Sequence, residues 1–207
     1  MFNTPIVMLD FETTGLSPAY GDRLTEVAAL RIVGDKVVER YVSLVNCNVM
    51  IPAFISDLTG ITQKMVNQAP RDTVVIPELL RFIGNDILAA HNASFDVKFL
   101  HAESTRLGLV SLHQDLICSL KLSRRIFPGL TSYKLTSLSS TLGIKFSSRA
   151  HRAEADAEAA AELLIYIGKY LHRNYSLTGL NPQIFAEINK LTAAKVPIFL
   201  QNKFANL

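Results

Sequence analysis

The most informative segment of this chain is Met8-Leu9-Asp10-Phe11-Glu12-Thr13-Thr14-Gly15. It ends an apolar run, and we expect residues 4–12 to form a short, buried β-strand. Because side chains alternate across a strand, Asp10 and Glu12 lie on one face and Phe11 lies on the other. Two carboxylates on one face of a core strand repel each other, so a bound divalent cation would stabilise them. From this segment alone, an acidic pair that reaches water at the strand end is an equally good interpretation.

The composition is that of an ordinary globular protein. The 207 residues are 49% hydrophobic and 19% charged, which suits one domain with a sizeable core. No apolar run approaches the roughly 18 residues of a membrane span, and no secretory signal is evident, so we expect no membrane association. Cys47 and Cys118 form neither a disulfide framework nor a metal-ligand pattern. We therefore expect a cytoplasmic protein with reduced thiols.

The net charge of +3 is unevenly distributed. Residues 1–120 carry nine Lys and Arg against thirteen Asp and Glu, whereas residues 121–207 carry twelve against five. A basic C-terminal part suits a polyanionic partner such as nucleic acid. A solvated basic surface explains the same charge equally well.

The pattern of apolar residues predicts an α/β fold. Early strands are expected at 4–12, 24–33 and 36–45, the last two joined by a hairpin at Gly34-Asp35, and later strands at 87–90 and 109–113. Helices are expected at 73–83, 94–107, 115–126 and 132–142 and within 151–171, with Ser94 capping the second of these. Consecutive strands followed by alternating strands and helices indicate a mixed five-stranded sheet flanked by helices.

The one plausible boundary lies near residues 174–179. We expect residues 1–173 to form the main domain and residues 174–207 to form a helical tail. In the tail, a helix begins at Asn181-Pro182 and ends before Pro197. The tail either packs back on the core or contacts a partner or a second copy of the chain.

Two further acidic residues lie where chemistry would need them. Asp96 falls in the first turn of a helix that follows a strand, although stabilisation by the helix dipole also explains it. Asp156 lies on the apolar stripe of the helix at 151–171, which is unusual for an unpaired carboxylate. On a continuous helix His151 would point about 140° away from Asp156. Both can face one site only if His151 lies in the loop before the helix.

These residues together predict metal-dependent hydrolysis of a phosphodiester. Four carboxylates suit two Mg²⁺ or Mn²⁺ ions, because such hard cations prefer oxygen ligands. Two ions about 4 Å apart activate a water and stabilise the leaving oxygen. An imidazole such as that of His151 can take the proton from that water.

Three motifs resemble those of the DEDDh exonucleases, the family of the bacterial replicative proofreading subunit and RNase T. They are Asp10-x-Glu12 within LDFETTGL, His91-Asn92-x-x-x-Asp96, and His151-x-x-x-x-Asp156. Supporting segments are Leu58-Thr-Gly-Ile-Thr62 followed by Pro70, and Tyr133-Lys134-Leu135-x-x-Leu138 before Leu142-Gly143-Ile144. The resemblance covers residues 4–171 in the family's order. Asp115-Leu116 departs from the family's Asp-Thr, and the tail matches nothing in the family.

The resemblance implies a ribonuclease-H-like fold and removal of 5′-monophosphates from a 3′ end. It implies two metals held by Asp10, Glu12, Asp96 and Asp156, with His151 as general base. It also implies a binding pocket for the terminal nucleotide. Thr13, Thr14 and Gly15 would lie under that nucleotide, Leu16 and Phe95 near its base, and Leu58, Thr59 and Ile61 in the same pocket. His91 and Asn92 match positions near the site, and we expect them first to support its structure.

We expect single-stranded DNA to be the preferred substrate, because LDFETTGL and LTGIT resemble the proofreading branch of the family more closely. The same resemblance implies a role in proofreading or repair. Trimming of RNA 3′ ends is the alternative, since the sequence does not reveal how the pocket treats a 2′-hydroxyl. A catalytically inert nucleic-acid-binding module would have lost a carboxylate, and none is lost here. A polymerase or a second copy of the chain stays open as a partner.

Overall fold

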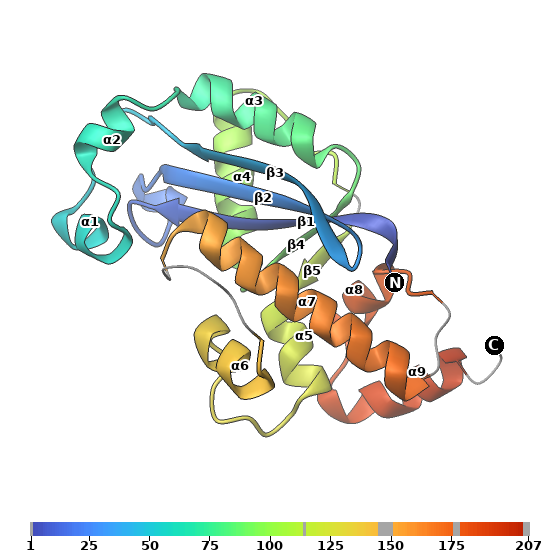
Figure 1. Cartoon of the computed structure of the whole chain (residues 1–207). Coiled ribbons are helices and arrows are strands. Elements are labelled where there is room, and N and C mark those ends of the chain that lie inside the picture. The colour runs from blue at the N-terminus through green and yellow to red at the C-terminus, as the bar shows by residue number, and fades with distance from the viewer. Residues whose placement is uncertain (1, 114, 145–150, 176–178, 205–207) are drawn as a thin grey trace.

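The computed structural model describes residues 2–113, 115–144, 151–175 and 179–204. Its centre is a five-stranded sheet with the strand order β3-β2-β1-β4-β5 (Figure 1). The strands are β1 (Phe2–Thr13), β2 (Leu24–Gly34), β3 (Lys36–Leu44), β4 (Ile87–Ala90) and β5 (Leu116–Cys118). β2 pairs antiparallel with β1 and β3, whereas β4 pairs parallel with β1 and β5. The predicted α/β fold with a mixed five-stranded sheet is confirmed.

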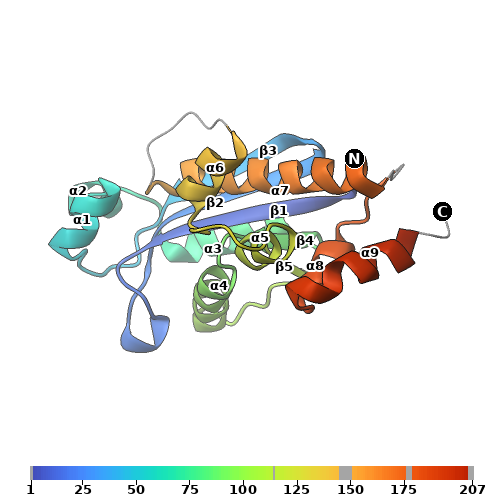
Figure 2. The ribbon, with the colours of Figure 1, turned by 90° about the horizontal axis from the view of Figure 1, so that it is seen from below.

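Helices cover both faces of the sheet. α7 (Ala153–Tyr175) lies along one face, together with α5 (Ser119–Ile126) and α6 (Leu135–Leu142), while α3 (Asp72–Ile83) and α4 (Ser94–Arg106) cover the other (Figure 2). α1 (Ala53–Thr59) and α2 (Gln63–Asn67) extend past one end of the sheet, as Figure 1 shows. In the part of the chain that the structure describes, no helix has both the length and the apolar character needed to cross a membrane.

The alternation of side chains along β1 separates two hydrophobic cores. Ile6 and Met8 are fully buried in the core under α7, whereas Val7 and Leu9 are fully buried in the core under α3 and α4. Because every second residue points the same way, Asp10 continues the row of Ile6 and Met8. The acidic face of β1 is therefore the face that α7 covers.

The fifth strand does not lie where the sequence predicts it. The expected strand at 109–113 is wrong, because those residues have no regular structure, and Val110 and Leu112 are 76% and 67% exposed. The strand is instead Leu116–Cys118, at the start of the expected helix at 115–126. These three residues pair in parallel with residues 88–90, so long-range pairing overrides the helical pattern of the segment.

The tail contains more than one helix. α8 (Gln183–Asn189) is followed by a 3₁₀ turn, η2 (Ala193–Lys195), and then by α9 (Val196–Phe204). The expectation that Pro197 follows the end of a single helix is therefore wrong. Pro197 lies in the first turn of α9, where proline is tolerated because the backbone N–H has no partner within the helix.

The tail packs on the main domain through α8. The rings of Phe2 and Phe185 meet edge to face, with their centroids 5.6 Å apart. The side chain of Asn189 accepts a hydrogen bond from the N–H of Cys118 at 2.7 Å and donates one to its carbonyl at 3.2 Å. α7 itself continues to Tyr175, past the expected boundary at residue 173. The tail thus shares one core with β1, β5 and α7.

Candidate active site

Carboxylates from three elements gather beside the end of β1. Oxygen atoms of Asp10, Glu12 and Asp156 all lie within 4.8 Å of one another, and each of these side chains is partly exposed. Asp96 is buried in the first turn of α4, near enough for its charge to raise the pKa of Asp10. The structure therefore brings together the four acidic residues that the sequence singled out.

The backbone before α4 places Asp96. β4 ends at Ala90, and Asn92 then adopts a left-handed conformation with φ 67°, which asparagine tolerates better than most residues. The helix begins at Ser94, so the expectation that Ser94 caps the helix is wrong. Ala93 precedes the helix, and no side-chain hydrogen bond caps it.

Crowding and burial make these carboxyl groups difficult to ionise. Burial, with smaller contributions from Asp96, Asp156 and Glu12, holds the pKa of Asp10 well above its usual range. Burial and the nearby Asp156 raise the pKa of Glu12 to about 7. Burial also raises the pKa of Asp96 to about 8, although backbone N–H groups partly offset this effect. A divalent cation would offset both the burial of these oxygen ligands and their mutual repulsion, so the cluster fits a site for such ions.

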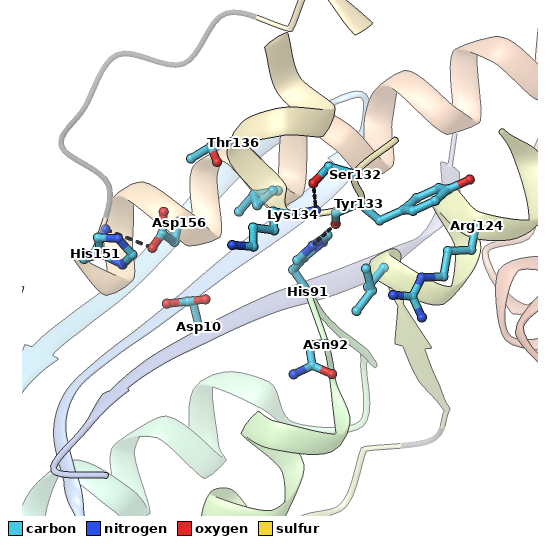
Figure 3. A pocket seen from close by; sticks show the side chains of 12 residues that line it. Asp10, His91, Asn92, Arg124, Ser132, Tyr133, Lys134, Thr136, His151 and Asp156 are labelled. Carbon is cyan, nitrogen blue, oxygen red and sulfur yellow. Dashed lines mark hydrogen bonds between the residues drawn. The ribbon is translucent and has the colours of Figure 1, made fainter. Parts of the chain in front are cut away.

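His151 lies just before α7, as the five-residue spacing to Asp156 requires. Its backbone has φ 66°, and its N–H donates a hydrogen bond to Oδ2 of Asp156 at 3.1 Å. The imidazole is exposed and lines the same cleft as Asp10 and Asp156 (Figure 3). The loop conformation therefore presents both side chains to one site.

Glu26 anchors the start of α7, although none of the sequence motifs includes this residue. Glu26 is 2% exposed and lies opposite Glu12 in the pairing of β1 with β2. Its carboxylate accepts hydrogen bonds from Arg152, at 2.5 Å and 3.0 Å, and from the N–H of Ala153 at 2.9 Å. The sequence does contain a feature that could have identified Glu26, because it is the one charged residue within the otherwise largely apolar strand segment LTEVAAL. This link fixes the helix end beside His151.

The turn after β1 is held by its own hydrogen bonds. The Thr13 hydroxyl donates to the carbonyl of Gly15 at 2.6 Å, and the Thr14 hydroxyl accepts from the N–H of Arg23 at 3.0 Å. A Cβ atom on Gly15 would lie 2.4 Å from the carboxylate of Asp22, so that side chain would have to move if the glycine were replaced. The next residue, Leu16, is 79% exposed.

The other predicted pocket residues divide into two groups. Leu58 is 53% exposed and Phe95 is half-buried, with the ammonium group of Lys98 4.9 Å from the centre of the Phe95 ring. Thr59 and Ile61 are buried. The hydroxyl of Thr59 donates to a backbone carbonyl within α1 and accepts from the N–H of Ile61. Thr59 and Ile61 thus hold the turn after α1 together.

A cleft of about 800 Å³ opens beside the carboxylates (Figure 3). His91 and Asn92 line it, and so do residues that sequence reasoning did not select: Leu120, Arg124, Ser132, Tyr133, Lys134, Leu135 and Thr136. Tyr133, Lys134 and Leu135 belong to a supporting motif of the sequence, which could have identified them. The cleft therefore has an acidic side and a basic side.

His91 connects the two sides of the cleft. Its ring nitrogens lie 2.9 Å from the Ser119 hydroxyl and 3.2 Å from the carbonyl of Tyr133. Burial, together with the charge of Arg124, lowers the pKa of His91 to about 4. A neutral imidazole in these contacts links β4 to α5 and to the loop before α6.

A family profile and individual relatives of known name indicate the same family for this chain. Residues 7–164 match the profile of the Exonuclease family RNase_T. A PolC-type DNA polymerase III of Caldanaerobacter subterraneus is 39% identical over 159 residues, which cover 77% of this chain and 11% of that protein. The 3′-5′ exonuclease DinG of Bacillus subtilis is 36% identical over 161 residues, which cover 78% of this chain and 17% of DinG. This chain thus spans only a small part of either relative.

Solved structures have the same fold. Exonuclease X, in complex with 5′ overhanging duplex DNA, is 28% identical with a TM-score of 0.69, covering 89% of this chain and 99% of its own. The nuclease domain of 3′hExo, a DEDDh family member bound to rAMP, is 20% identical with a TM-score of 0.72. That match covers 81% of this chain and 92% of the nuclease domain. The ribonuclease-H-like architecture is therefore shown.

Proposed function

This chain belongs to the exonuclease family, and we propose that it removes nucleotides one at a time from single-stranded 3′ ends as 5′-monophosphates. The observation that carries the proposal is the meeting of Asp10, Glu12 and Asp156 within 4.8 Å at one side of an open cleft. The full set of acidic residues also argues against an inert nucleic-acid-binding module. Such a module would have no reason to keep mutually repelling carboxylates beside a cleft.

In this proposal two divalent cations, Mg²⁺ or Mn²⁺, are held by Asp10, Glu12, Asp96 and Asp156. Such ions, when bound, polarise a phosphodiester and lower the pKa of a bound water. The imidazole of His151 accepts the proton of the attacking water, as a general base. The backbone N–H of His151 bonds to Asp156, which keeps the imidazole next to the acidic cluster. The water oxygen bonds to phosphorus as the bond between phosphorus and the 3′ oxygen of the preceding nucleotide breaks, and that oxygen takes up a proton from solvent and leaves as a 3′-hydroxyl.

The end of β1 and the turn that follows it receive the terminal nucleotide. Thr13, Thr14 and Gly15 form a rigid turn beneath it, and the exposed side chains of Leu16 and Leu58 are available to contact its base. Thr59 and Ile61 support Leu58 from within α1 and the turn that follows it. Phe95, Asn92 and His91 complete the surroundings.

DNA is the preferred substrate in this proposal. One relative named above is a DNA polymerase, and the structure of Exonuclease X contains bound duplex DNA. These two similarities support the preference for DNA. A polymerase is accordingly the first partner to test, with a second copy of the chain as the alternative. Cys47 and Cys118 are both free and buried, which fits the proposed location in the cytoplasm.

The test is a comparison of matched substrates. 5′-Labelled single-stranded DNA and RNA of the same sequence are incubated with Mg²⁺ or Mn²⁺ and resolved on a sequencing gel. We expect a ladder of products shortened from the 3′ end, with DNA degraded faster. Asp10→Asn should abolish the ladder, whereas Glu162→Gln, on the exposed side of α7, should leave it unchanged.

Two outcomes would contradict the proposal. Full activity in excess EDTA would exclude the metal mechanism, and faster degradation of RNA would replace DNA with RNA as the preferred substrate.

A further inference from the structure

The wall of the cleft opposite the carboxylates carries two cations that the mechanism does not use. Arg124 projects from the last turn of α5, and Lys134 directly precedes α6. Both are exposed and both line the cleft. In Figure 3, Lys134 extends between Asp156 and His91, and Arg124 lies beyond His91, farther from the acidic cluster. They form a basic row that leads away from the acidic cluster.

The backbone that carries these two cations is firmly held. The Tyr133 hydroxyl donates to the carbonyl of Phe127 at 2.7 Å, and the carbonyl of Tyr133 contacts His91 at 3.2 Å. The guanidinium of Arg124 lies 5.6 Å from the centre of the Tyr133 ring. The loop before α6 is thus anchored to α5 and to β4, so Lys134 starts from a fixed position.

The two cations have no acidic partner of their own. Across the described ranges, carboxylates lie within 4.0 Å of Arg23, Arg31, Arg40, Arg106, Arg152, Lys169 and Lys203, but none lies that close to Arg124 or Lys134. Cations that line a cleft without a protein anion suit an anionic ligand. The repeating anion of a nucleic acid strand is its phosphate.

We propose that Lys134 and Arg124 bind, in that order, the first and second phosphates upstream of the bond that is cut. The inference rests on the proposed function, because the acidic cluster then marks the scissile phosphate. The turn at Thr13–Leu16 takes the terminal nucleotide, so the remaining strand leaves along the opposite wall. Lys134 is closer to the acidic cluster than Arg124 is, which sets the order.

The test uses thymidine oligonucleotides with 5′-hydroxyl ends. A dinucleotide has only the scissile phosphate, a trinucleotide has one further phosphate upstream, and a tetranucleotide has two. Lys134→Ala should change kcat/KM for the dinucleotide by less than about twofold and lower it for the trinucleotide by about tenfold, the effect of one charge-assisted hydrogen bond. Arg124→Ala should show a similar loss only from the tetranucleotide onwards.

Salt dependence and matched variants complete the test. For a longer oligothymidine, the logarithm of the association constant should fall less steeply with the logarithm of the salt concentration. The slope should become smaller by about 0.7 for each cation removed. Lys134→Arg should recover most of the trinucleotide rate, because it restores the charge. Lys121→Ala, an exposed residue of α5 that does not line the cleft, should match the wild type on every substrate.

Three results would overturn the proposal. Equal losses on the dinucleotide and the tetranucleotide would mean that the two residues act on the reacting phosphate itself. No loss on any length would mean that they bind no phosphate, and a loss that appears first for Arg124 would reverse the order. If the wild type shortened none of the oligonucleotides, the proposed function would fail instead, whereas the salt slope would still report on phosphate binding.

Discussion

The crowded carboxylates should make the metal-free protein less stable as the pH rises. Burial raises the pKa of Asp96 from its ordinary 3.8 to about 8 in the folded protein. At pH values between these two numbers, the unfolded chain has released the proton of Asp96 and the folded chain still holds it. Stability from this group is therefore complete below pH 3.8 and is lost as the pH rises towards 8. Glu12, with a pKa of about 7, acts in the same direction.

The effect of the carboxylates on stability is best measured above pH 6.5, because below that pH the titration of His91 changes the stability in the opposite direction. The folded pKa of His91 is about 4 against an ordinary 6.5, so its contribution increases stability up to pH 6.5 and then stops changing. Between pH 6.5 and 8, Asp96 alone should cost about 2 kcal/mol, because each pH unit between its unfolded and folded pKa corresponds to about 1.4 kcal/mol. That is a large fraction of the stability of an ordinary domain.

The assay is urea unfolding in EDTA at several pH values, followed by far-ultraviolet circular dichroism because the chain has no Trp. Asp96→Asn keeps the shape of the side chain without its titration, so it should make the slope above pH 6.5 smaller, while the raised pKa values of Asp10 and Glu12 maintain the remainder. Addition of Mn²⁺ to the wild type at pH 8 should restore the lost stability. An unfolding free energy that does not change with pH in EDTA, or an unchanged slope in Asp96→Asn, would refute the reasoning.

Three other predictions address catalysis and positioning. His151→Ala should lower kcat by roughly 10²- to 10⁴-fold as general-base help is lost, and a single-turnover decrease below about threefold would exclude that role. Glu26→Ala should cost about 2 kcal/mol in urea unfolding because the buried N–H of Ala153 loses its acceptor, whereas Arg152 is exposed enough to be solvated, and it should also slow turnover. Glu26→Gln, which keeps an acceptor oxygen, should lose less on both measurements, and equal losses would argue against the anchor. Gly15→Ala should raise KM for an oligonucleotide because its Cβ displaces Asp22 from the turn; an unchanged KM would show that the turn adapts.

Local patterns were sufficient for most of the fold. The first three strands and the long helix α7 repeat their apolar residues over many positions, so their existence follows from geometry within each segment. The predicted strand at 109–113 failed because a few apolar residues in a loop have the same pattern as a short strand. The real fifth strand has only three residues, and pairing with β4 defines it.

In the candidate site, too, some features follow from the local sequence pattern and others from long-range packing. The sequence by itself determined that Asp10 and Glu12 share one face of β1 and that Asp156 lies on the inner side of α7, because both follow from the repeat of one strand or one helix. It also determined that His151 and Asp156 can face one site only if His151 precedes the helix, because a five-residue spacing on a helix separates the two side chains by about 140°.

Only the tertiary structure decided what surrounds those residues. The bond between Arg152 and Glu26 joins positions 126 residues apart, and the contact between His91 and Tyr133 spans 42 residues. Such pairs depend on how the helices pack on the sheet, and no periodicity within a segment encodes that packing. The same packing turns Lys134 towards the acidic cluster, which gives the cleft its second, basic side.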